Sequence, residues 1–404
     1  MRWKFYGFSR ARGIDGREPS RRASSARMSW RVACAAMLIG GLASGCDDRA
    51  PRVLRIGLLV AQSGPSAARG LDLLHGAQLA ADEINAAGYI VGGHPLSVRI
   101  EAGDDRSDDA GARRVAQSLL DSGVNAVIGP LNTTQAAQAI PVIAERGIPQ
   151  MITATGATLP GMGRGNVLRL LANDDVQARA MAAFAAEISR GRHIAVLNME
   201  GAFGRGLALS FDARLKERSI APALEMELGE GPLPDGVVDR LRGASVDTIA
   251  VFAREPQLMA LLDALEARGA TDVDVIGTNV VRNTSVAKRP VRVRALYATA
   301  TAIDAIEYPG GRAFLQRFGA RFHGQPVWGA HIAYDAVYAL ADAARQARSV
   351  DGPDLVTTLK RVELATRLNE QMRFAASGEQ VYPNVAIYQV DHGVWALQMI
   401  SASW

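Results

Sequence analysis

The sequence predicts an α/β protein built from two doubly wound parallel-sheet lobes. Between residues 53 and 158, short β-rich apolar runs alternate with helical patterns, an order typical of parallel strands covered by helices. The same alternation starts again after residue 173 and continues to about residue 301. Because a chain of 404 residues exceeds what one hydrophobic core usually supports, we expect two lobes of ordinary size.

The elements are expected in the following order. In the first half, strands are predicted at 53–60, 96–101, 126–128 and 148–152, with helices at 70–86, 108–122 and 136–146. In the second, strands are predicted at 194–198, 248–253, 273–276 and 294–301, with helices at 173–189, 207–218 and 257–268. Three helices then follow without strands between them, at 310–322, 329–348 and 353–362, and the tail from 373 to 397 alternates like a β-hairpin. Those helices are expected to pack against the first lobe, and the tail is expected to return to the second lobe.

One stretch, residues 126–158, organises the functional prediction. Its first strand ends at Gly129-Pro130, and a helix opens after Asn132, Thr133 and Thr134. Its second strand ends in a Thr-rich loop that contains Thr155, Gly156 and Thr158. Ligands of open parallel sheets bind at the carboxyl ends of strands, and a helix N-terminus with hydroxyl groups favours a small anion such as a carboxylate. The alternative is that Gly-Pro and Thr are ordinary turn formers here.

The charge distribution excludes a nucleic-acid partner. Residues 1–45 hold nine Arg or Lys and two acidic residues, so the remaining chain holds 36 basic and 39 acidic residues. No basic stripe with interleaved aromatic residues occurs in that remainder.

No enzyme, cofactor or metal signature is present. The six His residues are scattered without ligand spacing, and there is no phosphate-binding loop or nucleophile turn. Glycines 201, 204 and 206 have the wrong spacing for a dinucleotide fingerprint. Asp104 and Asp105 could form a carboxylate pair, but helix capping is the favoured interpretation.

The N-terminal region predicts export. From Met28, the more plausible start, a short charged segment precedes an apolar run at 32–42 and the small residues before Cys46. This ending resembles a bacterial lipobox, which implies cleavage before Cys46 and acylation of its thiol. An inner-membrane anchor is the alternative. Cys34 is the other cysteine, so the mature chain has no pair for a disulfide.

Between about residues 54 and 397 the chain resembles type I periplasmic solute-binding proteins of branched-chain amino acid uptake, the Leu/Ile/Val-binding protein family. The segments that carry this resemblance, by their order and spacing, are 55–57, Ser63-Gly64-Pro65, Asp82-Glu83-Ile84-Asn85-Ala86-Ala87-Gly88, Asp104-Asp105, Gly129-Pro130 with Thr133, Gly147-Ile148-Pro149, Phe203-Gly204-Arg205-Gly206 and Ala333-Tyr334-Asp335-Ala336.

The resemblance implies two lobes joined by a three-crossover hinge that closes on a small ligand without altering it. The crossovers would fall near 170–173, 297–302 and 371–374. The implied domains are a signal region at 1–45, a lipidated tether at 46–52, a first lobe at 53–171 with 302–372, and a second lobe at 172–301 with 373–404.

The resemblance also implies ligand-binding residues. Thr133, with Thr134 beside it, matches the hydroxyl residue that binds a ligand carboxylate, and Phe203 matches an aromatic pocket wall. In the second loop, Thr155, Gly156 and Thr158 match a small polar motif, but which Thr binds stays open.

Two positions depart from the pattern, and two others bear on the charge of the ligand. Asn279 replaces a Glu that binds the ligand ammonium in leucine-binding members, and Arg254 falls near an aromatic position. Asp174 matches an acid that holds the ammonium in related receptors, unless it is only the N-cap of its helix. Arg69 replaces a rim aromatic and could pair with a second carboxylate, unless it is a solvated charge.

We therefore expect a lipid-anchored periplasmic receptor that captures an amino acid, or a related small amide or carboxylate, and delivers it to an ABC permease. The alternative is a ligand-sensing or envelope-assembly lipoprotein with the same fold.

Overall fold

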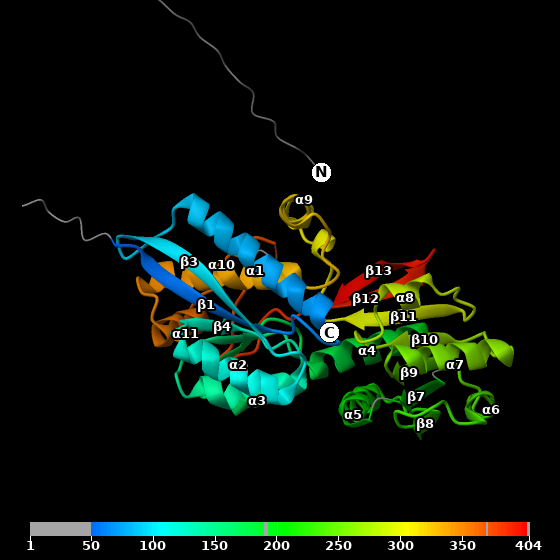
Figure 1. Cartoon of the computed structure of the whole chain (residues 1–404). Coiled ribbons are helices and arrows are strands. Elements are labelled where there is room, and N and C mark those ends of the chain that lie inside the picture. The colour runs from blue at the N-terminus through cyan, green and yellow to red at the C-terminus, as the bar shows by residue number, and fades with distance from the viewer. Residues whose placement is uncertain (1–49, 190–192, 200, 369–370, 402–404) are drawn as a thin grey trace, which may run out of the picture. The chain divides into compact units, whose positions relative to one another are not determined.

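The computed structural model describes residues 50–189, 193–199, 201–368 and 371–401, without the side chains of residues 201–203 (Figure 1). The predicted signal region and Cys46 lie outside these ranges. Within them the chain forms a six-stranded sheet and a seven-stranded sheet, both mostly parallel, which confirms the predicted fold class.

The first sheet has the strand order β2-β3-β1-β4-β5-β6. Its strands are β1 (Arg52–Val60), β2 (Ile90–Val91), β3 (His94–Asp104), β4 (Ala126–Ile128), β5 (Gln150–Ile152) and β6 (Val167–Arg169). Its helices are α1 (Ala67–Ala87), α2 (Asp109–Asp121), α3 (Thr133–Ala144), α9 (Gly311–Phe322), α10 (Ala330–Ala347) and α11 (Gly352–Arg361). All pairs are parallel except β2 with β3.

Strand β1 is covered on both faces. Leu58 packs in the same buried cluster as residues of α1 and α10, whereas its neighbour Leu59 packs with α2 and α3. Successive side chains of a strand point to opposite faces, so the apolar run of β1 fills two cores at once. Figure 1 shows α1 and α10 on one face and α2 and α3 on the other. The helices α9 to α11 thus contribute to the first sheet's core, with Phe314 and Leu355 fully buried.

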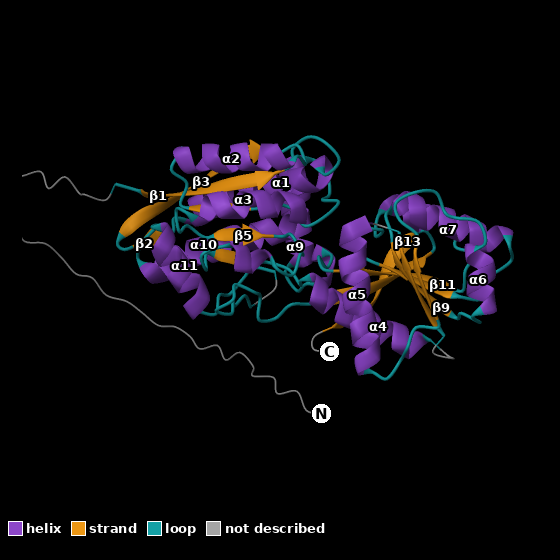
Figure 2. Cartoon of the chain, turned by 90° about the horizontal axis from the view of Figure 1, so that it is seen from below, coloured by secondary structure: helices purple, strands orange, loops and turns teal. Residues whose placement is uncertain are grey.

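The second sheet has the strand order β13-β12-β11-β10-β9-β7-β8. Its strands are β7 (Ile194–Asn198), β8 (Leu224–Glu227), β9 (Thr248–Phe252), β10 (Asp274–Gly277), β11 (Ala295–Ala300), β12 (Val385–Asp391) and β13 (Val394–Ser401). Its helices are α4 (Asp174–Ile188), α5 (Gly201–Glu217), α6 (Val237–Gly243), α7 (Glu255–Ala267) and α8 (Thr284–Lys288). Figure 2 shows α4 and α5 on one side of the strands and α6 and α7 on the other.

The C-terminal tail returns to the second sheet, where β12 pairs antiparallel with β11 and β13 pairs with β12. The hairpin begins at Val385, so the prediction of a strand from residue 373 is wrong. Residues between 371 and 384 form loop structure with isolated bridges such as Phe374 to Gln380. The strand-like alternation arises because Met372 and Phe374 are buried in the first sheet's core while Arg373 between them is exposed.

The capping interpretation of Asp104 and Asp105 is also wrong. The N-cap of α2 is Asp108, whose carboxylate accepts from the backbone N–H of Gly111 at 2.8 Å. The Asp104 carboxylate instead accepts from the backbone N–H of Gln62 at 2.8 Å and from the Ser63 hydroxyl at 2.6 Å. It therefore fixes the loop that follows β1.

Candidate functional site

Two loops of the first sheet meet where the sequence predicts a site. The strands β4 and β5 are parallel neighbours, so the loops that follow them leave the same edge of the sheet. The Thr133 hydroxyl, at the start of α3, accepts a hydrogen bond from the Gly156 backbone N–H at 3.2 Å. A Cβ atom on Gly156 would lie 2.5 Å from the Thr133 side-chain methyl, so only glycine allows this approach.

The first turn of α3 is left without a side-chain cap. Its N-cap residue is Asn132, but the Asn132 side chain makes no capping hydrogen bond. The Asn132 amide donates to the Ser66 hydroxyl at 3.1 Å, and its oxygen accepts from Arg69 at 3.4 Å. The N–H groups that a cap would satisfy therefore stay available at the positive end of the helix.

Arg169, the last residue of β6, forms hydrogen bonds to the second loop. Its side chain is completely buried and donates to the backbone carbonyls of Ala154 and, at 2.7 Å, Gly156. Its Nε forms an ion pair with Glu379 at 2.9 Å. The guanidinium thus ties the loop carbonyls to the segment that precedes β12, and this fixes the loop's conformation.

Asp174 brings a negative charge to the second loop. Its backbone N–H donates to the Thr155 carbonyl at 3.0 Å. The Asp174 Oδ1 atom is buried without a hydrogen-bond partner. Burial raises the pKa of the Asp174 carboxyl, although the nearby Thr155 side chain and the Arg169 charge act in the opposite direction.

The alternative in which Asp174 is only a helix cap is wrong. The N-cap of α4 is Asn173, whose side chain accepts from the Val176 N–H at 3.0 Å. Asp174 is the first residue of the helix, and its carboxylate is not needed as the cap.

Arg69 lies beside the first loop. In addition to its contact with Asn132, its guanidinium carbon lies 5.1 Å from the centre of the Trp328 ring. Burial lowers the pKa of the Arg69 guanidinium. Among the described residues no carboxylate forms an ion pair with it, so its charge has no counter-charge of its own.

The other predicted ligand residues lie outside the cluster of Thr133, Thr155, Gly156 and Asp174. Thr158 is exposed at the start of a short 3₁₀ helix (Leu159–Met162), and Thr134 is exposed with its hydroxyl bonded to Gln135 at 3.1 Å. Asn279 follows β10, and its buried Oδ1 has no hydrogen-bond partner. Arg254 is exposed at the N-cap position of α7.

Phe203 lies in α5, which begins earlier than predicted, at Gly201. Its side chain lies outside the described part of the structure.

The structure thus joins Thr133, Thr155, Gly156 and Asp174 into one cluster and connects Arg69 to it through Asn132. Sequence reasoning missed two residues of this region, Arg169 and Trp328. For Arg169 a signal existed: a lone Arg ends the apolar pair Val167-Leu168, directly before a predicted crossover. No pattern pointed to Trp328.

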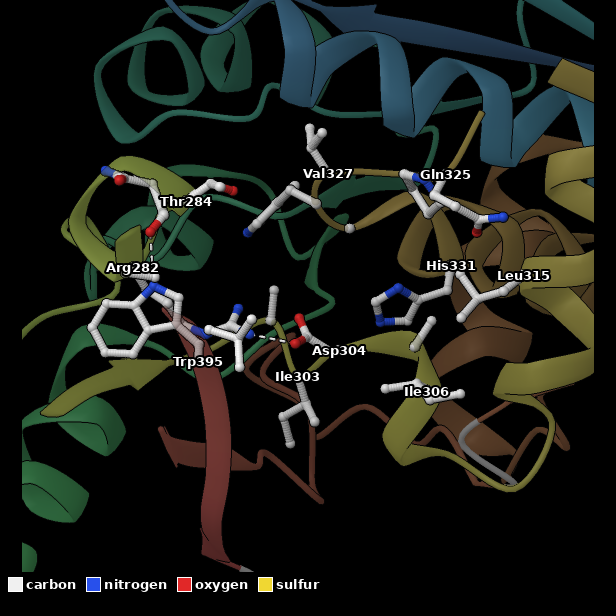
Figure 3. A pocket seen from close by; sticks show the side chains of 18 of the residues that line it. Arg282, Thr284, Ile303, Asp304, Ile306, Leu315, Gln325, Val327, His331 and Trp395 are labelled. Atoms are coloured by element: carbon white, nitrogen blue, oxygen red, sulfur yellow. Dashed lines mark hydrogen bonds and ion pairs between the residues drawn. The ribbon is translucent and has the colours of Figure 1, made fainter. Parts of the chain in front are cut away.

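A cavity of about 560 Å³ lies near the second predicted crossover (Figure 3). Trp395 and Arg282 lie on one side of it, and Leu315, Ile306 and His331 lie on the other. None of the ten predicted ligand residues lines this cavity.

Within the described ranges, no helix has the length and apolar character needed to cross a bilayer. The same ranges contain no group of three or more His, Cys, Asp or Glu side chains arranged to hold a metal ion.

Comparison with known proteins gives consistent matches. Residues 53–394 match a family model described as periplasmic binding protein. The Leu/Ile/Val-binding protein BraC3 of Rhizobium johnstonii is 26% identical over 344 residues, covering 84% of this chain and 92% of that protein. The leucine-, isoleucine-, valine-, threonine-, and alanine-binding protein of Pseudomonas aeruginosa is 25% identical over 372 residues, covering 88% and 94%.

Solved structures share the fold. The branched-chain amino acid transporter substrate binding protein LivJ of Streptococcus pneumoniae, in complex with isoleucine, aligns with a TM-score of 0.69 and 23% identity over 86% of this chain and 99% of that one. A solute-binding protein of an R. palustris ABC transporter, in complex with benzoate, aligns with a TM-score of 0.70 and 17% identity over 87% and 97%.

Proposed function

This chain belongs to the periplasmic binding protein family, and from that premise we propose that it captures a free amino acid for an ABC transporter. The family consists of solute-binding proteins and not of enzymes, and membership implies an extracytoplasmic location. The resemblance to Leu/Ile/Val-binding proteins predicted from the sequence is confirmed. Those relatives support an amino acid as the ligand. Because the R. palustris protein was solved with benzoate, the functional test also includes other small carboxylates.

The ligand carboxylate binds at the first loop. The uncapped N–H groups of α3 provide donors, and the helix dipole favours a negative group there. Thr133 and Thr134 place hydroxyls at the same end of the helix. This half of the site is present before any ligand arrives, because Asn132 is held by Ser66 and Arg69.

The ligand ammonium binds at Asp174, and this assignment rests on one observation above the others: the Asp174 Oδ1 is buried beside the second loop without a hydrogen-bond partner. A buried carboxylate oxygen without a partner costs free energy, and a cation that pairs with it recovers that cost. Thr155 and Gly156 contribute the polar groups next to it.

The second lobe completes the site by closing over the ligand. Phe203, Arg254 and Asn279 are its proposed contacts, and Asn279 supplies an uncharged acceptor in place of a carboxylate. The two bodies proposed to move toward each other are the predicted lobes, 53–171 with 302–372 and 172–301 with 373–404.

Arg69 sets the preference among amino acids. A half-buried guanidinium without a counter-ion attracts a second carboxylate, so acidic amino acids should bind better than amides of the same size. Glutamate and glutamine form a matched pair for this comparison.

We further propose that the mature chain is a lipoprotein anchored through Cys46 and delivers its ligand to an ABC permease. Replacement of Cys46 by Ser should release the protein from the membrane fraction, and continued membrane association would contradict the anchor.

The function is tested by thermal-shift titration of the purified mature chain with the proteinogenic amino acids and a set of small carboxylates. A ligand at 100 times its Kd adds about 2.7 kcal/mol of stability, which is readily measured. If no compound in the panel shifts the transition, solute capture is the wrong function.

The role of Asp174 is tested with Asp174→Asn, and Asp175→Asn is the matched control because Asp175 is exposed in the same helical turn. Loss of the charge pair should weaken amino-acid binding by about 2–5 kcal/mol, whereas the control should bind normally. Because the pKa of Asp174 is raised, wild-type affinity should fall as acidification protonates it, and the Asp174→Asn variant should lack this dependence. Equal affinity in wild type and Asp174→Asn would assign the ammonium elsewhere.

A further inference from the structure

The cavity of about 560 Å³ is a separate feature from the two-loop site. Its lining residues fall into five places: 282–287, in and before α8; 393–395, where β13 begins; 302–306, which follow β11; Leu315 of α9; and 325–331, which run into α10. Its volume falls in the range of roughly 300–1,000 Å³ that is usual for small-molecule pockets.

The larger part of the cavity wall is apolar, and hydrogen bonds hold segments of it in place. The Trp395 indole N–H donates to the Asn283 carbonyl at 2.8 Å, and the Trp328 backbone N–H donates to the Asp72 carboxylate at 2.6 Å. Ile303 and Leu315 add aliphatic surface. The Trp395 indole ring is fixed by its hydrogen bond, and the Trp328 ring lies 5.1 Å from the Arg69 guanidinium carbon, so little ordering of these side chains opposes ligand binding.

Exposed apolar side chains gather at this cavity. Nine large hydrophobic residues are exposed in the described part of the chain, and three of them line it: Val327 at 72%, Val394 at 62% and Ile306 at 47%. Single exposed apolar residues are normal on a protein surface, but a cluster around a concave site marks a place where an apolar molecule binds.

The charged groups in the wall neutralise each other. Arg282 forms an ion pair with Asp304 and lies 3.7 Å from the centre of the Tyr388 ring. The Asp304 backbone N–H donates to the Tyr388 hydroxyl at 3.1 Å, which fixes the pair. Burial lowers the pKa of His331 to about 4, so this imidazole is neutral at pH 7.

A ligand with net charge would therefore lose hydration without gaining a free counter-charge. Hydrogen-bonding groups are nevertheless available, since Thr284 and Gln325 line the cavity.

We propose that this cavity is a second binding site, which takes an uncharged small molecule with an aromatic or branched apolar body and one or two hydrogen-bonding groups. The site is distinct from the two-loop cluster, because Thr133, Thr155, Gly156 and Asp174 do not line it, although its wall residue Trp328 also contacts Arg69. Indole is a suitable probe: it is uncharged and planar, and it carries one N–H donor.

The test is isothermal titration of the mature chain with indole, indole-3-acetate and tryptamine, which share a ring and differ in charge. Indole should bind with a stoichiometry of one, and each charged analogue should bind at least about tenfold more weakly. Absence of saturable indole binding, or equal binding of the charged analogues, would overturn the proposal.

Two rim variants of opposite charge locate the site. Val394→Asp and Ile306→Lys change exposed side chains, so the fold should tolerate them, and both should weaken indole binding at least about tenfold. Leu209→Asp is the matched control, because Leu209 is 65% exposed and does not line the cavity. If both rim variants bind indole like the wild type, or if Leu209→Asp weakens binding as much as they do, the probe binds elsewhere and the site is refuted.

Discussion

Replacement of Arg169 by Met tests whether a buried guanidinium organises the second loop. Methionine keeps most of the volume of the arginine stem but removes every donor. The carbonyls of Ala154 and Gly156 then lose their partner, and so does the Glu379 carboxylate. An unpaired buried acceptor costs about 1–3 kcal/mol, and removing one member of a buried ion pair costs about 3–5 kcal/mol.

These terms overlap, and the Glu379 side chain is 27% exposed, so its carboxylate regains part of its hydration. We therefore expect Arg169→Met to lower the free energy of unfolding by about 3–5 kcal/mol. The matched control is Glu379→Gln, which keeps an oxygen acceptor for the Arg169 Nε and should cost only about 1 kcal/mol.

Equilibrium unfolding in urea measures both variants, with the denaturant slope checked for constancy. A loss below about 1 kcal/mol for Arg169→Met would refute the reasoning, because the loop carbonyls would then have found other partners. An equal loss in both variants would refute it in another way, since the ion pair and not the carbonyl contacts would carry the effect.

Two further predictions follow from the same lobe. Gly156→Ala should weaken amino-acid binding at least about tenfold, because its Cβ would press against Thr133, whereas Gly161→Ala, which has open space around its Cβ, should bind normally in the same titration. Burial raises the pKa of Asp72 from 3.8 to about 6, so its charge costs stability above pH 6 and the cost disappears below about pH 4. Solvent screening reduces the full value of about 3 kcal/mol to about 1–2, and Asp72→Asn should be more stable than wild type by that amount at pH 8 and equal at pH 4 in urea unfolding. A stability difference that shrinks as pH rises would contradict the assignment.

Much of the fold could be predicted from local pattern. Strand β1 is an apolar run because both its faces are buried, and the helices that cover it repeat apolar residues at helical spacing. Among the short elements that were missed, β6 has three residues and α8 has five, too few to establish a period, whereas the equally short β4 could be found because Gly129-Pro130 marks its end. The tail misled the prediction, because buried side chains in the loop after residue 371 imitate the alternation of a strand.

The candidate site, too, could be predicted only in part. The two loops after β4 and β5 could be found from their Gly, Pro and Thr residues, because turn chemistry is local. The partner of each side chain could not. Asn132 has the right identity for a cap, yet its side chain binds Ser66 and Arg69 instead, and these residues are distant in sequence.

The sequence by itself determined the class of fold, the family, and the edge of the first sheet at which the candidate site lies, since each depends on residue order and short-range preference. Only the tertiary structure decided that Asn173 caps α4 and leaves Asp174 with an unpaired oxygen, that Arg169 lies beneath the second loop, and that two tryptophans separated by 67 positions share a cavity with a neutralised ion pair. The physical reason is that burial and pairing depend on which distant segments pack together, and the free energies of charges and unpaired polar atoms follow from that packing.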